Sequence, residues 1–197
     1  GLEIAFEGTG VTAELRGNPV DNPDAVAYMG VLLDGTLAPE DMTVFPVDTA
    51  DYTWYTLAQG LPQGRHTLRL VKRTELLQSS VELRSLRIAD GDLLPPPLPV
   101  SERRMEFIGD SITCGFGNLA VPDAPFRTRE EDGWQSYAAM TARDLRAEFS
   151  VVSISGFSVY KSPYGDRLPD CYDWAGKCGG EPLLWDFAVF CPQVVVV

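Results

Sequence analysis

The sequence predicts a two-part fold of the β plus α/β class, in which an antiparallel sandwich precedes a domain built on a parallel sheet. Residues 1–92 hold short segments of alternating polarity separated by turn residues, a pattern typical of antiparallel strands. A proline-rich stretch follows them. Beyond it, apolar strand-like segments alternate with helical periodicity and end on an uninterrupted valine run, which favours a parallel sheet covered by helices.

The first part consists of short period-two segments. We expect strands at residues 4–6, 11–15, 26–33, 52–57, 66–71 and 81–88. Turn signals rich in glycine, proline and asparagine separate these segments, for example at residues 8–10, 17–19 and 60–62. Regular short strands without a helical period predict an antiparallel sandwich, and a jelly roll fits them best.

The boundary between the two parts is a proline-rich linker at residues 93–101, with the sequence Leu-Leu-Pro-Pro-Pro-Leu-Pro-Val-Ser. Consecutive prolines lack the N–H that a sheet requires, cannot continue a helix and favour extended polyproline geometry. We therefore expect an accessory domain at residues 1–92 and a second domain at residues 102–197.

The second domain shows mixed periodicity. We expect a strand from residue 104 up to Gly109, a helix at 133–147, a strand at 149–154, a long loop at 157–180, a helix at about 182–190 and a strand at 194–197. Asp132 and Gln135 have the form of a capping box, and apolar residues recur after them at three- and four-residue spacing. Because the carboxyl ends of parallel strands meet at one edge, groups just after two such strands should lie together.

The first of these strands leads directly into Gly109-Asp110-Ser111. A serine hydroxyl is a weak nucleophile, so it needs a nearby base and donors for a developing oxyanion. Gly109 permits a sharp turn, and Ser111 then lies where free backbone N–H groups of a first helical turn point outward. Asp and Ser are also ordinary helix caps, so the tripeptide alone more often indicates a capped turn.

The longer stretch Gly-Asp-Ser-Ile-Thr-Cys-Gly-Phe-Gly-Asn, residues 109–118, resembles the first block of the GDSL or SGNH hydrolases. Its continuation is similar to carbohydrate esterase family two, whose members place a small jelly roll before a three-layer α/β/α hydrolase domain. Residues 149–156 end on a glycine as the second block does. The resemblance implies that Ser111 is the nucleophile and that the N–H groups of Ser111 and Gly156 bind the oxyanion. The family often has small or basic residues after that glycine, whereas this chain has Phe157-Ser158, which leaves the shape of the acyl pocket open.

The same superfamily requires an oxyanion asparagine and a general-base histidine, which we expect beyond Val197, on a C-terminal segment or on a second chain. His66 is the single histidine of the sequence and falls in an accessory-domain strand, so we interpret it as structural. Residues 1–197 would then be the N-terminal portion of the enzyme. A serine without its base loses most of its rate enhancement, so we expect this portion to have little activity alone.

The resemblance implies a serine esterase that removes O-acetyl groups from plant-cell-wall polysaccharide of the xylan or glucomannan type, without a cofactor. Tyr172 and Trp174, in the long loop near the expected cleft, are candidate sugar contacts. An alternative is a carbohydrate-binding module attached to an inert, truncated hydrolase remnant. A lipase-type esterase is a third class, which the acidic, non-amphipathic chain supports little.

The net charge of −12 and the isoelectric point near 4.4 argue against nucleic acid and anionic membranes as partners, while neutral polysaccharide remains compatible. The 197 residues are 45% hydrophobic and 22% charged, which is ordinary for a globular protein. The first residues alternate like a strand and do not resemble a secretory signal. We expect a secreted protein whose signal peptide is not present in this chain.

Four cysteines allow three pairings, and the sequence alone does not choose among them. Cys171 and Cys178 flank a short loop, so we favour a local disulfide between them. Cys114 and Cys191 follow and precede different strands, and we expect both to be free and buried. Neither has a second Cys or His at ligand spacing, so no metal site is predicted.

Overall fold

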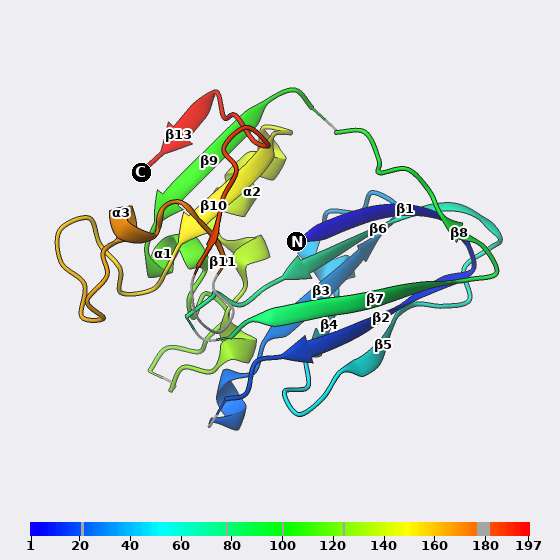
Figure 1. Ribbon diagram of the computed structural model, residues 1–197, viewed down its shortest axis with the longest axis horizontal. Coiled ribbons are helices and arrows are strands. Elements are labelled where there is room, and N and C mark those ends of the chain that lie inside the picture. Colours follow the sequence, from blue (N-terminus) through cyan, green and yellow to red (C-terminus); the bar gives the residue numbers. More distant parts are fainter. Residues whose placement is uncertain (21, 78, 100, 124, 177–181) are drawn as a thin grey trace. The chain divides into compact units, whose positions relative to one another are not determined.

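The computed structural model describes residues 1–20, 22–77, 79–99, 101–123, 125–176 and 182–197. The chain forms two compact units, which Figure 1 traces by colour along the sequence. The first unit contains Gly1–Arg73 and Gln78–Leu98, and the second contains Thr74–Leu77 and Pro99–Val197. The fold is mixed α/β, and the sheets of the first unit are antiparallel.

The first unit has two antiparallel sheets. One has the order β4-β3-β6-β1-β8, with β1 (Leu2–Gly8), β3 (Tyr28–Leu33), β4 (Thr43–Pro46), β6 (Gly64–Lys72) and β8 (Asp92–Leu93). The other has the order β5-β2-β7, with β2 (Gly10–Gly17), β5 (Thr53–Ala58) and β7 (Val81–Ala89). Two 3-10 turns, η1 (Pro23–Ala25) and η2 (Pro39–Asp41), flank β3.

Side chains from both sheets meet in one hydrophobic core. Phe6 of β1, Leu15 of β2 and Leu68 of β6 are fully or almost fully buried in it. The register of β1 with β6 places Ile4 opposite Leu68, so alternate residues of the two strands face the same core. The six expected strands are thus confirmed within a few residues. The short strands β4 and β8 were missed because neither has an alternating pattern long enough to detect.

The second unit is built on a three-stranded parallel sheet with the order β10-β9-β13. The central strand is β9 (Arg104–Gly109), and β10 (Glu148–Ser153) and β13 (Val194–Val196) pair with it in parallel. All three strands were expected from the sequence. Figure 1 shows them side by side, with β9 between the other two.

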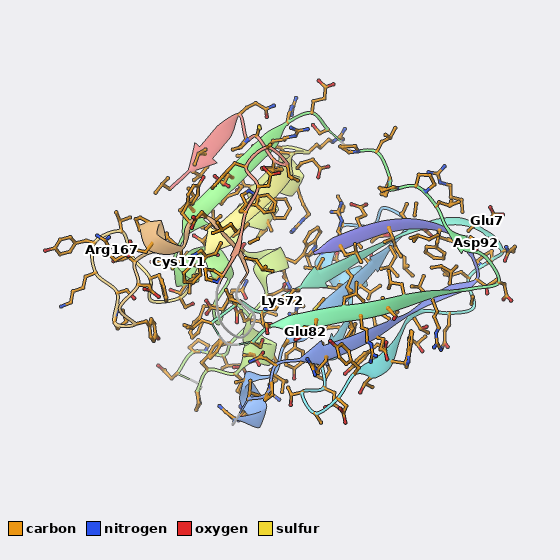
Figure 2. The ribbon with its side chains drawn as sticks, in the orientation of Figure 1. Glu7, Lys72, Glu82, Asp92, Arg167 and Cys171 are labelled. Atoms are coloured by element: carbon orange, nitrogen blue, oxygen red, sulfur yellow. The ribbon has the colours of Figure 1, made fainter. Side chains whose placement is uncertain are left out.

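Both faces of β9 carry buried side chains. Helix α2 (Tyr137–Asp144) packs Ala138 and Ala142 against Phe107 of β9. The next residue, Ile108, points to the opposite face, where it joins the cluster of Leu168 and Cys171 on the short helix α3 (Leu168–Cys171). Figure 2 labels Cys171 on α3 and Arg167 just before it. The Asp170 side chain accepts the Arg167 N–H and two bonds from its guanidinium, which fixes the first turn of the helix. The remaining elements are α1 (Ser111–Cys114), η3 (Thr128–Glu130), η4 (Gly133–Gln135), β11 (Trp174–Gly176) and β12 (Leu183–Leu184).

The helix expected at 133–147 begins later than its capping pattern indicated. Asp132 accepts the Trp134 N–H and caps the single 3-10 turn η4, and its second oxygen binds the Gln135 amide. Ser136 then caps α2 by accepting the Ala139 N–H. Two capping residues, four positions apart, therefore divide the segment, because each favours a non-helical backbone at its own position.

The helix expected at about 182–190 is wrong. Leu183 and Leu184 form strand β12, which pairs antiparallel with β11. The Trp185 N–H donates to the Asp173 carbonyl at 2.7 Å and extends this attachment. A short apolar run fits a helix or a strand equally well by periodicity, and here the contact with β11 decides. None of the helices among the described residues is long and apolar enough to cross a membrane.

Candidate active site

Helix α1 begins at Ser111, immediately after strand β9. The Asp110 side chain accepts the Ile112 N–H at 3.0 Å and caps the helix. A methyl group at Gly109 would lie 2.1 Å from the Thr113 hydroxyl, so the turn requires glycine there. Gly115 ends the helix in the left-handed conformation, with φ 81°. The sequence of this turn therefore dictates its geometry locally, and Asp110 stabilises the turn as expected.

Ser111 and Gly156 follow the carboxyl ends of adjacent parallel strands. Gly109 of β9 is paired with Ser153 of β10, and the Ile154 N–H donates to the Gly109 carbonyl at 3.3 Å. Cys114 of α1 contacts Ser153 through its sulfur, at 3.2 Å from the hydroxyl oxygen. The structure thus brings the two predicted residues to the same edge of the sheet, where ligands of parallel sheets ordinarily bind.

Gly156 adopts the left-handed conformation, with φ 78°. A methyl group at this position would come within 2.7 Å of the Tyr164 ring, so the ring lies directly against the glycine. Tyr164 is more than half exposed and stacks on buried Phe157, with ring centroids 5.6 Å apart. An aromatic wall therefore adjoins the backbone that was predicted to bind the oxyanion.

Tyr172 and Trp174, the predicted sugar contacts, have partners inside the second unit. The Tyr172 hydroxyl donates to buried Glu106 of β9 at 2.7 Å, and this bond, together with burial, raises the pKa of Tyr172 to about 12. Its ring lies 5.4 Å from that of Phe187. Trp174 packs against the cluster around Leu168. Their role as substrate contacts stays a prediction.

His66 lies on β6 in the first unit, as expected, and both of its ring nitrogens have partners. Nδ1 is 2.9 Å from Asp34 Oδ2, and Nε2 is 2.8 Å from the Pro62 carbonyl. Two acceptors require two N–H groups, which only the imidazolium has. The Pro62 carbonyl and then Asp34 therefore raise the pKa of His66. This arrangement leaves neither nitrogen available as a base.

We expect an NMR titration of the His66 ring to give a midpoint above the ordinary value of 6.5. Because the folded-state pKa is raised, the stabilisation is fully present below pH 6.5 and is lost as the pH rises through the raised pKa. Burial raises the pKa of Asp34, but hydrogen bonds from His66 and the Thr67 N–H outweigh it and lower the net value. The contribution of Asp34 is therefore present above its unfolded pKa and is lost only in acid.

The urea-unfolded chain is the control for this titration, and its midpoint should be ordinary. His66→Gln should remove the decrease in unfolding free energy that the parent shows as the pH rises above 6.5. A folded-state midpoint at or below 6.5 would show that the two acceptors do not hold the imidazolium.

The cysteines depart from expectation at one position. Cys114 is buried and not in a disulfide, as predicted, and burial followed by the charge of Glu75 raises the pKa of its thiol. Cys191 is also free but exposed, so its expected burial is wrong. It lies in the irregular segment before β13, two residues ahead of Gln193, where the bonds to β9 begin. Cys178 lies outside the described residues, so the Cys171–Cys178 disulfide stays a prediction.

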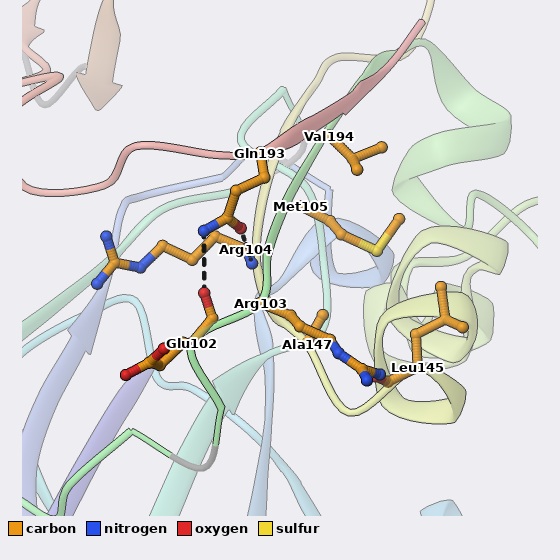
Figure 3. Close-up of a pocket in the computed structure, with 8 residues that line it drawn as sticks. All are labelled: Glu102, Arg103, Arg104, Met105, Leu145, Ala147, Gln193 and Val194. Atoms are coloured by element: carbon orange, nitrogen blue, oxygen red, sulfur yellow. Dashed lines mark hydrogen bonds between the residues drawn. The ribbon is translucent and has the colours of Figure 1, made fainter.

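A pocket of about 490 Å³ opens at the amino-terminal ends of the parallel strands, away from Ser111. Figure 3 shows its lining at the amino end of β9, where the Gln193 side chain accepts the Arg104 N–H and donates to the Glu102 carbonyl. Ser111 follows the carboxyl end of the same strand. The chemistry at Ser111, and not the volume of this pocket, marks the candidate site. Among the described residues, no group of three or more metal-ligating side chains is present.

Glu75 is a residue near the site that the sequence did not indicate. It lies between β6 and β7 in the sequence but packs with the second unit, where its side chain is buried. It accepts the N–H of Ser155, 80 positions further along the chain. No local pattern predicts such a contact.

Similar proteins identify the family. Residues 1–97 match the family model described as the N-terminal domain of carbohydrate esterase 2. The cellulase/esterase CelE of Acetivibrio thermocellus is 33% identical over 200 residues, which cover 100% of this chain and 23% of CelE. An acetylxylan esterase / glucomannan deacetylase of Cellvibrio japonicus is 28% identical over 137 residues, or 68% of this chain and 38% of that protein.

A solved structure matches almost the whole chain. It is a family two carbohydrate esterase from Clostridium thermocellum in complex with cellohexaose, with 32% identity and a TM-score of 0.81. The match covers 98% of this chain and 56% of that structure, so the chain spans about half the length of the solved esterase and less of the curated relatives. The chain belongs to carbohydrate esterase family two, and its residues 1–97 are the N-terminal domain of that family.

Proposed function

We propose that the protein is a serine esterase that removes O-acetyl groups from polysaccharide of the xylan or glucomannan type. One observation carries the proposal: Ser111 begins a capped helix at the sheet edge where Gly156 follows the neighbouring strand. Ser111 is partly exposed, and a serine that solvent and substrate can reach beside backbone N–H groups is what acyl transfer requires. The similarity to an acetylxylan esterase / glucomannan deacetylase supports this substrate class.

In the proposed mechanism, Ser111 Oγ bonds to the acetyl carbonyl carbon and gives its proton to a general base. The N–H groups of Ser111 and Gly156 stabilise the oxyanion of the tetrahedral intermediate. The sugar oxygen leaves with the proton, and water then hydrolyses the acetyl-enzyme to acetate. Because both nitrogens of His66 are engaged, we propose that the base is a histidine outside residues 1–197, as we propose for the oxyanion asparagine.

Further parts of the proposal concern fold, substrate and location. We assign jelly-roll connectivity to the first unit and an SGNH-type three-layer arrangement to the second. Tyr172 and Trp174 would border the sugar chain, and no cofactor is needed for the reaction. Acetylated wall polysaccharides lie outside cells, so the enzyme would act as a secreted protein.

The test is acetate release by the complete gene product that contains this sequence. We expect release from acetylated xylan or acetylated glucomannan, and hydrolysis of p-nitrophenyl octanoate about 100-fold slower than that of the acetate ester. This margin reflects an acyl pocket shaped for two carbons. Preference for octanoate would indicate a lipase-type esterase. Binding of the polysaccharide without acetate release would indicate a carbohydrate-binding module.

A further inference from the structure

Two segments of the second unit meet at the buried side chain of Glu75. Its Oε2 atom accepts the Ser155 N–H at 2.7 Å, and the Cys114 sulfur lies 3.4 Å from the same oxygen. Ser155 directly precedes Gly156, and Cys114 is the last residue of the helix that Ser111 begins. One carboxylate oxygen therefore bonds to both segments that carry the proposed catalytic groups.

The contact between Cys114 and Glu75 has a direction, because the thiol of Cys114 is protonated. Burial, and then the Glu75 charge, raises the pKa of Cys114, so the sulfur keeps its proton at neutral pH and donates it toward Glu75. The same sulfur approaches the Ser153 hydroxyl at the end of β10. Cys114 thus connects α1 with Glu75 and also with the strand that leads to Gly156.

Glu75 is itself held in place through its backbone. Its N–H donates to Oε1 of Glu131 at 2.8 Å, and Glu131 is completely buried. The next residue, Asp132, exchanges two hydrogen bonds with the Asn118 side chain, both 3.0 Å long. Glu131, which holds Glu75, is therefore part of a segment that is hydrogen-bonded to Asn118, shortly after α1.

We propose that Glu75 is a positioning residue for the oxyanion site: it sets the orientation of the Ser155–Gly156 backbone relative to the helix of Ser111. A buried backbone N–H that loses its acceptor is destabilised, so the side-chain oxygen of Glu75 favours one orientation of the Ser155 peptide. Gly156 has no side chain to hold it, so the peptide on its N-terminal side must be fixed by other groups. This inference rests on the proposed esterase function.

The experiment compares Glu75→Ala and Glu75→Gln in the complete gene product, with p-nitrophenyl acetate as substrate. We expect Glu75→Ala to lower kcat by about 10- to 100-fold and to change KM by less than about threefold, because a displaced donor weakens transition-state binding most. Glu75→Gln should stay within about threefold of the parent, since its amide oxygen can accept the same N–H. Leu77→Ala, a change in the same segment at a partly exposed side chain, is the control and should have no effect.

A second measurement does not depend on activity. In the complete gene product, amide hydrogen exchange at Ser155 should be at least about 10-fold faster in Glu75→Ala than in the parent and nearly unchanged in Glu75→Gln. Near-ultraviolet circular dichroism checks that each variant is folded. If Glu75→Ala does not fold, the Glu75→Gln variant still tests the proposal. Faster exchange at Ser155 in that variant than in the parent would overturn it.

Unchanged kcat in a folded Glu75→Ala variant would overturn the positioning role, as would equal losses in the Ala and Gln variants. Failure of the esterase proposal would give a different result. In that case Ser111→Ala would leave hydrolysis intact, while exchange at Ser155 would still report whether Glu75 holds this backbone.

Discussion

Ser111→Ala should lower kcat/KM for acetyl ester hydrolysis by the complete gene product by about 10⁴-fold or more. The substitution removes the atom that forms the acetyl-enzyme, so the remaining oxyanion donors have no covalent intermediate to stabilise. The helix should persist, because its cap is the Asp110 side chain and the methyl group of alanine fits the first helical turn. Initial rates with p-nitrophenyl acetate and acetate release from polysaccharide both measure the loss.

Ser101→Ala is the matched control for this prediction. Ser101 belongs to the same unit but precedes β9, where it accepts the Arg103 N–H at 3.0 Å, at the opposite edge from Ser111. Its removal should leave the rate unchanged. Hydrolysis that persists in a folded Ser111→Ala variant would assign the nucleophile to another residue.

Gly156→Ala should lower kcat by about 100- to 1,000-fold and reduce the free energy of unfolding by about 1–3 kcal/mol. The added methyl group would occupy a backbone with φ 78° and come within 2.7 Å of the Tyr164 ring. Relief of this contact must move either the ring or the peptide, and movement of the peptide displaces the proposed oxyanion donor. Steady-state kinetics and urea unfolding test the two parts separately.

Gly165→Ala separates the effect of backbone conformation from that of the contact. Gly165 has φ 95°, also left-handed, but a methyl group there would meet nothing within 4 Å. It should cost about 1 kcal/mol of stability and leave kcat near the parent value. Similar kinetic losses in both variants would mean that the position of Gly156 beside Tyr164 has no special role in the reaction.

Local sequence signals predicted the parts of the fold that depend on nearby residues. The six longer strands of the first unit and the three parallel strands of the second follow from alternation or from continuous apolar runs, and the turn at Ser111 follows from Gly109 and the cap Asp110. The interpretation of His66 as structural also agrees with its two bonded nitrogens. Each of these features depends on hydrophobic period, turn chemistry or strand position, which few residues are enough to specify.

The errors have a different origin. Leu183 and Leu184 fit a helix by their spacing, yet they form a strand because β11 provides the pairing partner. Ser136 displaced the start of α2, since a second cap in the same segment competes with the first. Cys191 was expected to be buried beside its strand, but the segment before β13 leaves it exposed. In each case the local pattern allowed two structures; a second cap selected one at α2, and the surrounding structure selected one at the other two positions.

The sequence by itself determined the capped turn at Ser111, most of the strands and the family resemblance, because these are properties of contiguous residues. Only the tertiary structure revealed that Glu75 bonds to Ser155 and lies against Cys114, which are 80 and 39 positions away. It also showed that the Tyr172 hydroxyl binds Glu106. The physical reason is that a buried hydrogen bond needs a partner delivered by another segment, and no short-range periodicity specifies which segment that is.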